Sequence, residues 1–479
     1  MAKARIVGKL DASQNLSTSP FTVSGLKGDT FNYSFFIFCD SASTTAGDVD
    51  ITVNADTGTN YNRYYMRGST TTASASVVSS QANIDLVNFT RNQSSRNSFA
   101  IGSLTGESGS ARKISVNHSS GHTPQVYQND AYWTNTADEA TSITFTGTVS
   151  ASYTWHIVVW EVPRTNLDGW EYVNKLDWSS ETAEKSFSSL DGDTDIQYLL
   201  DWDGDQDLGI ECNNDGGANY IRQFLTNSSG TLSSVNQTVS TIGVNDQSKV
   251  VINADSGVDR LSYISSSQTS AGQQFQAGYW WQNTASNLTS LDCTPSASAI
   301  GSCKLYRKKL KPSMQTDLYN LPFRTIEEYD VSGDFSAGYT FSGLNGDDYL
   351  MLKVEWLGEQ TASGSAYLEV QFNSDTGSNY TYQQLYGQSS TAGAGTATET
   401  YTALSYNATI SVMSGILYIY PKSGEYRPIL MDKWTYGENT NAVRANWWLN
   451  SADEITSMKV SATNTTAMTG KIRVSAIYA

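Results

Sequence analysis

One stretch of the chain has residue types and a spacing that could bind calcium. Four carboxylates stand on alternating residues, at Asp201, Asp203, Asp205 and Asp207. Calcium takes about six to eight oxygen ligands, and an EF-hand loop has glycine at its sixth position and a bidentate glutamate at its twelfth. Here Gly204 is the fourth residue and Cys212 is the twelfth. We interpret the stretch as a solvated loop, with a weak cation site on the four aspartates as the alternative.

A second pattern, Asn-x-Asp-x-Gly-x-Asn-Tyr, occurs three times. Its copies stand at Asn54, Asp56, Gly58 and Asn60, at Asn213, Asp215, Gly217 and Asn219, and at Asn373, Asp375, Gly377 and Asn379. Asp and Asn side chains accept backbone hydrogen bonds in turns, and glycine supplies positive φ. The pattern predicts a reverse turn between two strands, with the tyrosine anchoring its exit. A calcium site is the alternative, although each turn supplies only one carboxylate.

The third pattern is a pair of aromatic residues, again in three copies: Tyr132-Trp133, Trp280-Trp281 and Trp447-Trp448. Adjacent side chains of a strand point to opposite faces of the sheet, so one ring of each pair is expected in the core. We interpret the other ring as a contact with the next domain, because Trp and Tyr are enriched at interfaces. Stacking on a glycan is the alternative for Trp133, Trp280, Trp281, Trp447 and Trp448.

Residues suited to catalysis are few. The chain has three histidines, His118, His122 and His156, and the first two share a Ser/Gly-rich loop with no evident third metal ligand nearby. The sequence contains no G-x-S-x-G elbow and no phosphate-cradling Gly-Lys loop. A carboxylate pair that forms only in the folded chain stays open. We predict no enzymatic activity, no catalytic residue, no cofactor and no resident metal.

Four cysteines, Cys39, Cys212, Cys293 and Cys303, are too scattered for a disulfide framework and form no C-x-x-C motif. We favour free buried thiols, with a bridge between Cys293 and Cys303 as the alternative.

The elements that position these residues recur in a fixed order. A turn into Gly-Asp precedes each Asn-x-Asp copy, and an aromatic pair follows it. The copies begin at residues 54, 213 and 373, much farther apart than the roughly 20 to 50 residues of a solenoid unit. Each copy therefore predicts a whole domain, and we place the domains at 1–163, 164–311 and 312–479. Proline-containing linkers are expected at 163–166 and 311–323.

Between the turns, apolar residues alternate with polar ones, as in Phe31-Asn32-Tyr33-Ser34-Phe35. Period-two alternation is typical of strands with one buried face, and no capped helix of about ten residues or more is evident. The chain is predicted to be all-β, with three tandem antiparallel β-sandwich domains of jelly-roll type and about eight strands each. An immunoglobulin-like sandwich is the alternative, but its Cys…Trp…Cys spacing is absent.

Composition limits the partners. The formal net charge is −17, whereas a nucleic-acid-binding surface needs clustered Lys and Arg. We expect no nucleic-acid partner. The start of the chain has no signal-peptide core, and no apolar run approaches the roughly 20 residues of a membrane span. We therefore expect synthesis in the host cytoplasm without a signal peptide, and no membrane partner.

The segment from Phe372 to Gly387, entered from Leu344-Asn345-Gly346-Asp347, resembles a β-sandwich repeat of virion proteins of tailed bacteriophages, found in fibres and decoration proteins. The first copy departs from this pattern at Arg63–Gly68 and the second at Phe224–Asn227. The resemblance implies a structural role at the virion surface, with other virion proteins of the capsid or tail as partners. It carries no chemistry, because its motif is a turn.

These observations predict a non-enzymatic structural protein of a bacteriophage virion, a capsid decoration or a tail or fibre component. Three similar domains in one chain can imitate a homotrimer, so we expect them to pack around a pseudo-threefold axis. A homo-oligomer is compatible with this expectation. The alternatives are a receptor-binding adhesin for a host surface glycan and a polysaccharide depolymerase. Head or tail location, copy number and bound Ca²⁺ or glycan stay open.

Overall fold

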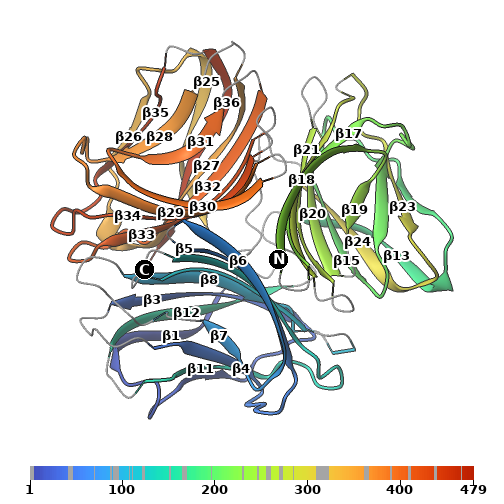
Figure 1. Cartoon of the computed structure of the whole chain (residues 1–479), viewed down its shortest axis with the longest axis horizontal. Coiled ribbons are helices and arrows are strands. Elements are labelled where there is room, and N and C mark those ends of the chain that lie inside the picture. The colour runs from blue at the N-terminus through green and yellow to red at the C-terminus, as the bar shows by residue number, and fades with distance from the viewer. Residues whose placement is uncertain are drawn as a thin grey trace.

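A computed structural model shows how the chain folds (Figure 1). It describes residues 5–478 apart from 41–46, 70, 87–88, 90–96, 107, 110–111, 121–124, 150–152, 164–169, 196, 229–230, 245–246, 255–259, 269–272, 284, 309–322, 361–365, 389–390, 408–410, 436–439 and 465–466. Within these residues the structure is almost entirely antiparallel β-sheet, which confirms the predicted fold class. One 3-10 turn, η1 (Gly346–Asp348), interrupts the described strands. No helix among them is long and apolar enough to cross a membrane.

The strands form three eight-stranded sheets and three four-stranded sheets. We call them large and small sheets, and we call the pair that holds β1–β12 unit 1, the pair that holds β13–β24 unit 2, and the pair that holds β25–β36 unit 3. The three units have the same strand order. The domain boundaries at 163/164 and 311/312 stay predictions, because they fall at or beside residues outside the described part of the chain.

The strands of unit 1, in sheet order, are given first. Its large sheet contains β1 (Arg5–Gln14), β12 (Tyr153–Pro163), β3 (Phe31–Asp40), β8 (Ser98–Leu104), β9 (Arg112–Ser120), β10 (Gln125–Trp133), β5 (Tyr61–Ser69) and β6 (Thr72–Gln81). Its small sheet contains β2 (Phe21–Ser24), β11 (Ser142–Gly147), β4 (Val49–Val53) and β7 (Ile84–Leu86).

Units 2 and 3 repeat this order. The large sheet of unit 2 contains β13 (Glu171–Glu181), β24 (Ala299–Lys308), β15 (Gln197–Gly204), β20 (Gln247–Asn253), β21 (Arg260–Gln268), β22 (Gln273–Trp281), β17 (Tyr220–Ser228) and β18 (Thr231–Val239); the small sheet contains β14 (Lys185–Ser188), β23 (Ser290–Pro295), β16 (Leu208–Cys212) and β19 (Ile242–Val244). The large sheet of unit 3 contains β25 (Arg324–Asp334), β36 (Ala467–Tyr478), β27 (Tyr349–Gln360), β32 (Ser411–Ile419), β33 (Arg427–Thr435), β34 (Thr440–Trp448), β29 (Tyr380–Gln388) and β30 (Thr391–Glu399); the small sheet contains β26 (Tyr339–Ser342), β35 (Ser457–Ala462), β28 (Ala366–Phe372) and β31 (Thr402–Asn407).

Eight strands of each unit pair in a nested order. In unit 1, β1 pairs with β12, β2 with β11, β3 with β8, and β4 with β7. Nested pairing across two packed sheets is the topology of a jelly roll. The other four strands, β9, β10, β5 and β6, extend the large sheet. The prediction of about eight strands per unit was therefore too low, because strands such as β6 are rich in Ser and Ala and give little apolar alternation.

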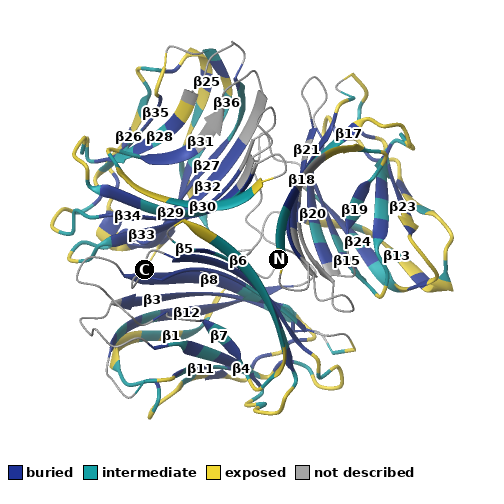
Figure 2. Cartoon of the chain, viewed as in Figure 1, coloured by how far each residue is buried: buried dark blue, intermediate teal, exposed yellow. Residues whose placement is uncertain are grey.

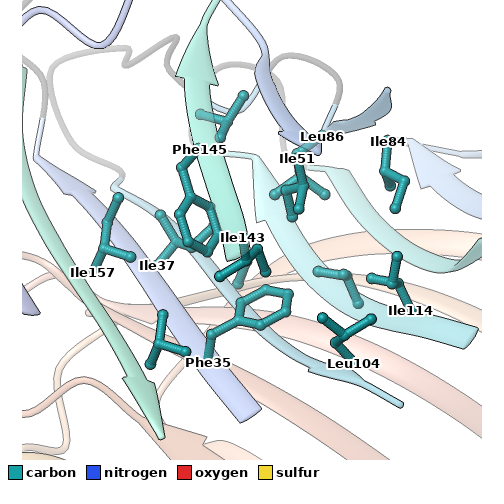
Figure 3. Packing of buried hydrophobic residues seen from close by; sticks show 14 of the residues in the cluster. Phe35, Ile37, Ile51, Ile84, Leu86, Leu104, Ile114, Ile143, Phe145 and Ile157 are labelled. Atoms are coloured by element: carbon teal, nitrogen blue, oxygen red, sulfur yellow. The ribbon is translucent and has the colours of Figure 1, made fainter. Parts of the chain in front are cut away.

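Each unit has its own hydrophobic core between its two sheets. In unit 1, inward residues of the large sheet, such as Phe35 and Ile157, meet inward residues of the small sheet, such as Ile51 and Phe145 (Figure 3). The rings of Phe35 and Phe145 contact edge to face, with centroids 5.6 Å apart. Units 2 and 3 enclose equivalent clusters of their own residues. Burial inside each sandwich thus fixes which face of every strand points inward.

The three units pack around a common axis, with their small sheets outermost (Figure 1). Strands β6, β18 and β30 contact one another in all three combinations, and β5 contacts β29. Corresponding residues of β5, β17 and β29, namely Met66, Leu225 and Leu385, belong to one buried cluster. This arrangement has the pseudo-threefold symmetry that three similar units in one chain predict.

A cyclic set of close contacts surrounds this axis. A Cβ on Gly68 of unit 1 would lie 2.6 Å from the carbonyl oxygen of Gln384 in unit 3, and one on Gly387 of unit 3 would lie 2.7 Å from Oγ of Ser234 in unit 2. The corresponding residue of unit 2 is Asn227, whose side-chain Nδ2 donates to the carbonyl oxygen of Ser76 in unit 1 at 2.8 Å. Each unit therefore contacts the next with the same position of the same strand.

Units 1 and 3 are also joined by a wide apolar contact between the outer faces of their large sheets. Phe38 stacks on Tyr420 with ring centroids 3.8 Å apart, and the indole of Trp447 donates to the carbonyl oxygen of Asn97 at 3.0 Å. The predicted linkers at 163–166 and 311–323 lie mostly outside the described residues. Of their ends, Pro163 closes β12, and the ring of Phe323 lies 6.2 Å from that of Tyr418.

Candidate functional site

The Asn-x-Asp copies form the turns that carry the chain from the small sheet to the large sheet. In unit 1, Asn54 and Ala55 have φ of 54° and 51°, and the amide of Asp56 donates to the carbonyl oxygen of Val53 at 3.0 Å. Two left-handed residues inside such a hydrogen bond define a type I′ turn. The turns at Asn213 and Asn373 have the same conformation.

The glycine of the motif has a different role from the one that the sequence predicts. Positive φ occurs at Asn54 and Ala55, and Gly58 is not among the residues with positive φ. A Cβ on Gly58 would lie 2.9 Å from Nδ2 of Asn60 and 3.1 Å from Oδ1 of Asp56. Glycine is needed here because the Asn60 and Asp56 side chains meet over its backbone, and the prediction that it supplies positive φ was wrong.

The aspartate of each motif connects the turn to the aromatic strand. The carboxylate of Asp56 accepts hydrogen bonds from the Gly58 amide at 2.8 Å, from Asn60 at 2.9 Å and from the indole of Trp133 at 2.6 Å. Equivalent bonds join Asp215 to Trp281 at 2.8 Å and Asp375 to Trp448 at 2.7 Å. Two of the three recurring sequence patterns are therefore two halves of one network.

The first asparagine of each motif holds the loop that follows the aromatic strand. Oδ1 of Asn54 accepts from the amides of Thr141 and Ser142 at 2.7 and 3.1 Å, and its Nδ2 donates to the Glu139 carbonyl oxygen at 2.8 Å. Asn213 and Asn373 make the same three contacts in units 2 and 3. The asparagine side chain thus supplies the hydrogen bonds that hold together two loops distant in sequence.

The tyrosine at the exit of each turn anchors the strand before it, as the sequence predicts. The hydroxyl of Tyr61 accepts from the Val53 amide at 2.8 Å. Tyr220 and Tyr380 do the same for Cys212 and Phe372, at 2.8 and 2.9 Å. Burial raises the pKa of all three phenols, so they stay protonated at neutral pH.

A buried arginine completes the network, and our sequence reasoning missed it. Arg112, Arg260 and Arg427 lie directly opposite Trp133, Trp281 and Trp448 on the neighbouring strand, with the guanidinium carbon 4.9, 4.7 and 4.7 Å from the ring centroids. Such geometry allows a cation–π attraction. A signal was available, because each arginine precedes its tryptophan by the same interval, at 112 and 133, 260 and 281, and 427 and 448.

The electrostatics of the three aspartates suit a structural role. Burial alone would raise the pKa of Asp56, but the bonds from Trp133, Asn60 and Gly58 outweigh it and hold this pKa below its usual value. The same balance lowers the pKa of Asp215 and Asp375. These carboxylates are ionised at neutral pH and their oxygens already accept hydrogen bonds, which suits fixing a turn and does not suit proton transfer.

The four aspartates of the candidate cation loop are spread over β15 and the loop that leads from β15 in the large sheet to β16 in the small sheet. Asp201 and Asp203 lie on β15, where Asp201 stands opposite Lys249 and Lys304. Asp205 accepts from the Ile300 amide at 2.8 Å, and the carbonyl oxygen of Asp207 accepts from the Ser296 amide at 2.8 Å. Among the described residues, no three His, Cys, Asp or Glu side chains gather so that they could hold a metal ion.

The aromatic pairs are buried on both sides of their strands. Trp133, Trp281 and Trp448 belong to the three sandwich cores. On the outward side, Trp447 is 0% exposed and lies against unit 1, while Trp280 is 1% exposed. A covered ring has no free face for a sugar, so these five tryptophans do not form the glycan platform that we considered as an alternative.

The histidines are dispersed. His118 is buried, with its ring centroid 4.4 Å from that of Tyr127 in a stacked arrangement and its Nδ1 3.1 Å from the side-chain Nδ2 of Asn129. His156 lies 2.8 Å from Asp11. His122 lies outside the described residues. The structure therefore places His118 and His156 in different surroundings and does not join them in one site.

All four cysteines are free and buried. Cys293 and Cys303 belong to the same core cluster of unit 2, and burial followed by contact with Cys293 raises the pKa of Cys303 well above its usual value. Buried thiols of this kind are unreactive toward soluble oxidants.

The fold also brings two carboxylates together that no sequence pattern marked. Asp50 on β4 and Asp85 on β7 stand directly opposite each other in unit 1. Burial and the charges of Asp85 and Asp48 raise the pKa of Asp50 to about 7. Burial and Asp48 raise that of Asp85 to about 6, although Arg63 lies 3.2 Å away. In unit 2 the corresponding cross-strand pair is Gly209 and Gly243.

Comparisons with known proteins add little. No family model matches the chain, and no curated protein matches it. Among solved structures, the chain is similar to a fructosyltransferase from A. japonicus at 7% identity and a TM-score of 0.20, over 81% of this chain and 67% of that one. It is similar to A. japonicus CB05 at 6% identity and a TM-score of 0.20, over 80% of this chain and 66% of that chain, just under two thirds. The LG1-3 region of the laminin alpha2 chain matches at 9% identity and a TM-score of 0.15, over 97% and 99% of the two chains. Likenesses this weak carry no argument about function.

Proposed function

We propose that the chain is a non-enzymatic structural protein at the surface of a bacteriophage virion, a capsid decoration or a tail or fibre component that contacts other virion proteins. One observation carries the proposal. The residues that recur in all three units bond to one another: Asp56 holds Trp133, Asn54 holds the loop at Thr141, and Tyr61 holds Val53. The residues that recur in this chain are therefore residues that fix its loops by hydrogen bonds.

Such a network supports rigidity. Each hydrogen bond contributes about 1 kcal/mol, and bonds to a charged carboxylate contribute about 1.5 to 3 kcal/mol. The contact between units 1 and 3 adds a second level of rigidity, because the buried rings of Phe38 and Tyr420 stack across it. A rigid body with broad polar faces suits a protein that works by assembly. The virion itself enters through the resemblance of Phe372–Gly387 to phage virion repeats.

Purified particles give the direct test. We expect quantitative mass spectrometry of particles freed of soluble protein to detect the chain at a fixed, integral copy number, and immunogold labelling to place it on the head or on the tail. A chain that is abundant in lysates but absent from purified particles would contradict the proposal. A host-glycan role is checked separately on a glycan array, where a structural virion protein gives no saturable signal.

A further inference from the structure

The large sheets have two kinds of edge strand. The peripheral edges are β1, β13 and β25, and the axial edges are β6, β18 and β30. An exposed edge presents unpaired backbone groups to other chains, and proteins commonly guard it with charged residues or a β-bulge. The two sets of edges differ most in their charged residues.

The peripheral edges are guarded three times in the same way. Strands β1, β13 and β25 carry three, four and five charged residues. Each also has a break in its register near its start, between Ile6 and Gly8, between Tyr172 and Asn174, and between Thr325 and Glu327. The charged residues and the register breaks disfavour pairing of these strands with another chain.

The axial edges have less of this protection. Strands β6 and β18 contain no charged residue, and β30 contains only Glu399, which pairs with Arg444 at 2.9 Å. The register of β18 on β17 and of β30 on β29 is unbroken, whereas that of β6 on β5 shifts between Tyr61 and Arg63. In the described part of the chain each axial edge has a sheet neighbour on one side only. Ser, Thr, Ala and Gly predominate, so the edges present mainly their backbone.

The axial edges also form one surface. They contact one another where they meet at the pseudo-threefold axis, and from there they radiate across the molecule (Figure 1). Their outer parts contain intermediate and exposed residues (Figure 2). Among the exposed ones are Ser79, Thr238 and Thr398, each near the outer end of its strand. The three edge strands thus carry a single charged residue, Glu399, which is paired with Arg444, on a chain whose net charge is −17.

We propose that this surface binds a second copy of the same chain. A partner that pairs with all three edges must present three extended segments with few charges and the same spacing, and this chain carries such a set. Antiparallel edge pairing is self-complementary, so a twofold axis perpendicular to the pseudo-threefold axis brings equivalent edges together. Two chains of charge −17 repel each other least where the contacting strands carry few charges. The contact continues the interface that already joins the three units.

The test is the oligomeric state of the full chain. Multi-angle light scattering over a concentration series is expected to give a mass twice the 52.2 kDa of one chain. The triple variant Ser79→Lys, Thr238→Lys, Thr398→Lys places one charge on each axial edge and is expected to halve that mass. The matched control is Ser13→Lys, Ser179→Lys, Ser332→Lys, on exposed serines of the peripheral edges, and it keeps the doubled mass at the same net charge.

Circular dichroism and the melting temperature show whether both triple variants fold as the parent chain does. A parent chain that stays monomeric at every concentration overturns the proposal, and so does an axial triple variant that folds and stays dimeric. Hydrogen exchange on intact particles tests whether a different virion protein binds this surface. Slower exchange of β6, β18 and β30 in particles, with a chain that is monomeric in solution, assigns the surface to a different virion protein and overturns the second copy.

Discussion

Units 1 and 2 share a strand order and a turn network, yet the outer faces of their large sheets differ. In unit 1, β3 presents Phe36 and Phe38, both 0% exposed, to the contact with unit 3. In unit 2, the corresponding strand β15 presents Asp201 and Asp203, and Asp201 stands between lysines of the neighbouring strands. The inward residues of a strand thus determine the sandwich, and the outward residues of the same strand determine which unit packs against which.

The turn network is shared by all the units, so its disruption should have large and similar effects. Trp448→Ala removes a buried ring, its bond to Asp375 and the contact with Arg427, and Trp281→Ala does the same in unit 2. We expect each to lower the free energy of unfolding of its unit by about 3 to 5 kcal/mol. Urea denaturation measures the loss. A change below about 1 kcal/mol in either unit would show that the network is not equivalent there.

The outer faces should respond unequally. Phe38→Ala removes a ring stacked on Tyr420, and we expect a loss of about 3 kcal/mol together with faster hydrogen exchange in the facing strands of units 1 and 3. Asp201→Ala changes a partly exposed residue that stands opposite Lys249 and Lys304 in the strand register, and we expect the free energy of unfolding to fall by less than about 1 kcal/mol. Equal losses in the two variants would mean that the face of unit 2 is packed as tightly as that of unit 1.

The aspartates of the turns should give a smaller, pH-dependent effect. Asp56→Asn weakens the bonds from Trp133 and Asn60, and we expect a loss of about 1 to 2 kcal/mol at pH 7, with the same loss for Asp215→Asn. The pKa of Asp56 is lowered in the folded chain, so its contribution is present above about pH 4 and is lost as pH falls further. The difference in the free energy of unfolding between the parent and the variant, measured by urea denaturation, should therefore be largest at pH 7 and shrink as pH falls below about 4. A difference that does not shrink on acidification would contradict the assignment.

The smallest effect concerns a carboxylate pair that unit 1 has and unit 2 lacks. The pKa of Asp50 is raised to about 7, so the folded chain holds a proton that the unfolded chain releases, and stability falls as pH rises from about 4 to above 7. Asp50→Asn removes this loss. We expect it to stabilise unit 1 by about 1 kcal/mol at pH 8 and to have little effect at pH 4. Thermal melts at both pH values check this, with Gly209→Asn in unit 2 as the control that gains no pH dependence.

The sequence predicted the local parts of the candidate site well. The Asn-x-Asp motif indicated the turn, and the following tyrosine indicated its anchor, because both interactions close within about ten residues. It misassigned the role of Gly58, since the close approach of Asn60 and Asp56 is visible only in three dimensions. It missed Arg112, Arg260 and Arg427, because each contacts a tryptophan on a neighbouring strand, and only a comparison of the three copies shows the constant interval between them.

Taken alone, the sequence determined the all-β fold, the threefold repetition and the alternation of each strand, because strand period and turn chemistry depend on neighbouring residues. Tertiary structure decided the nested strand pairing, the bond between Asp56 and Trp133, the facing carboxylates of Asp50 and Asp85, and the burial of Trp447 against unit 1. These contacts join residues that are far apart in the chain. They form only when sheets pack, and packing depends on shape and burial over the whole molecule.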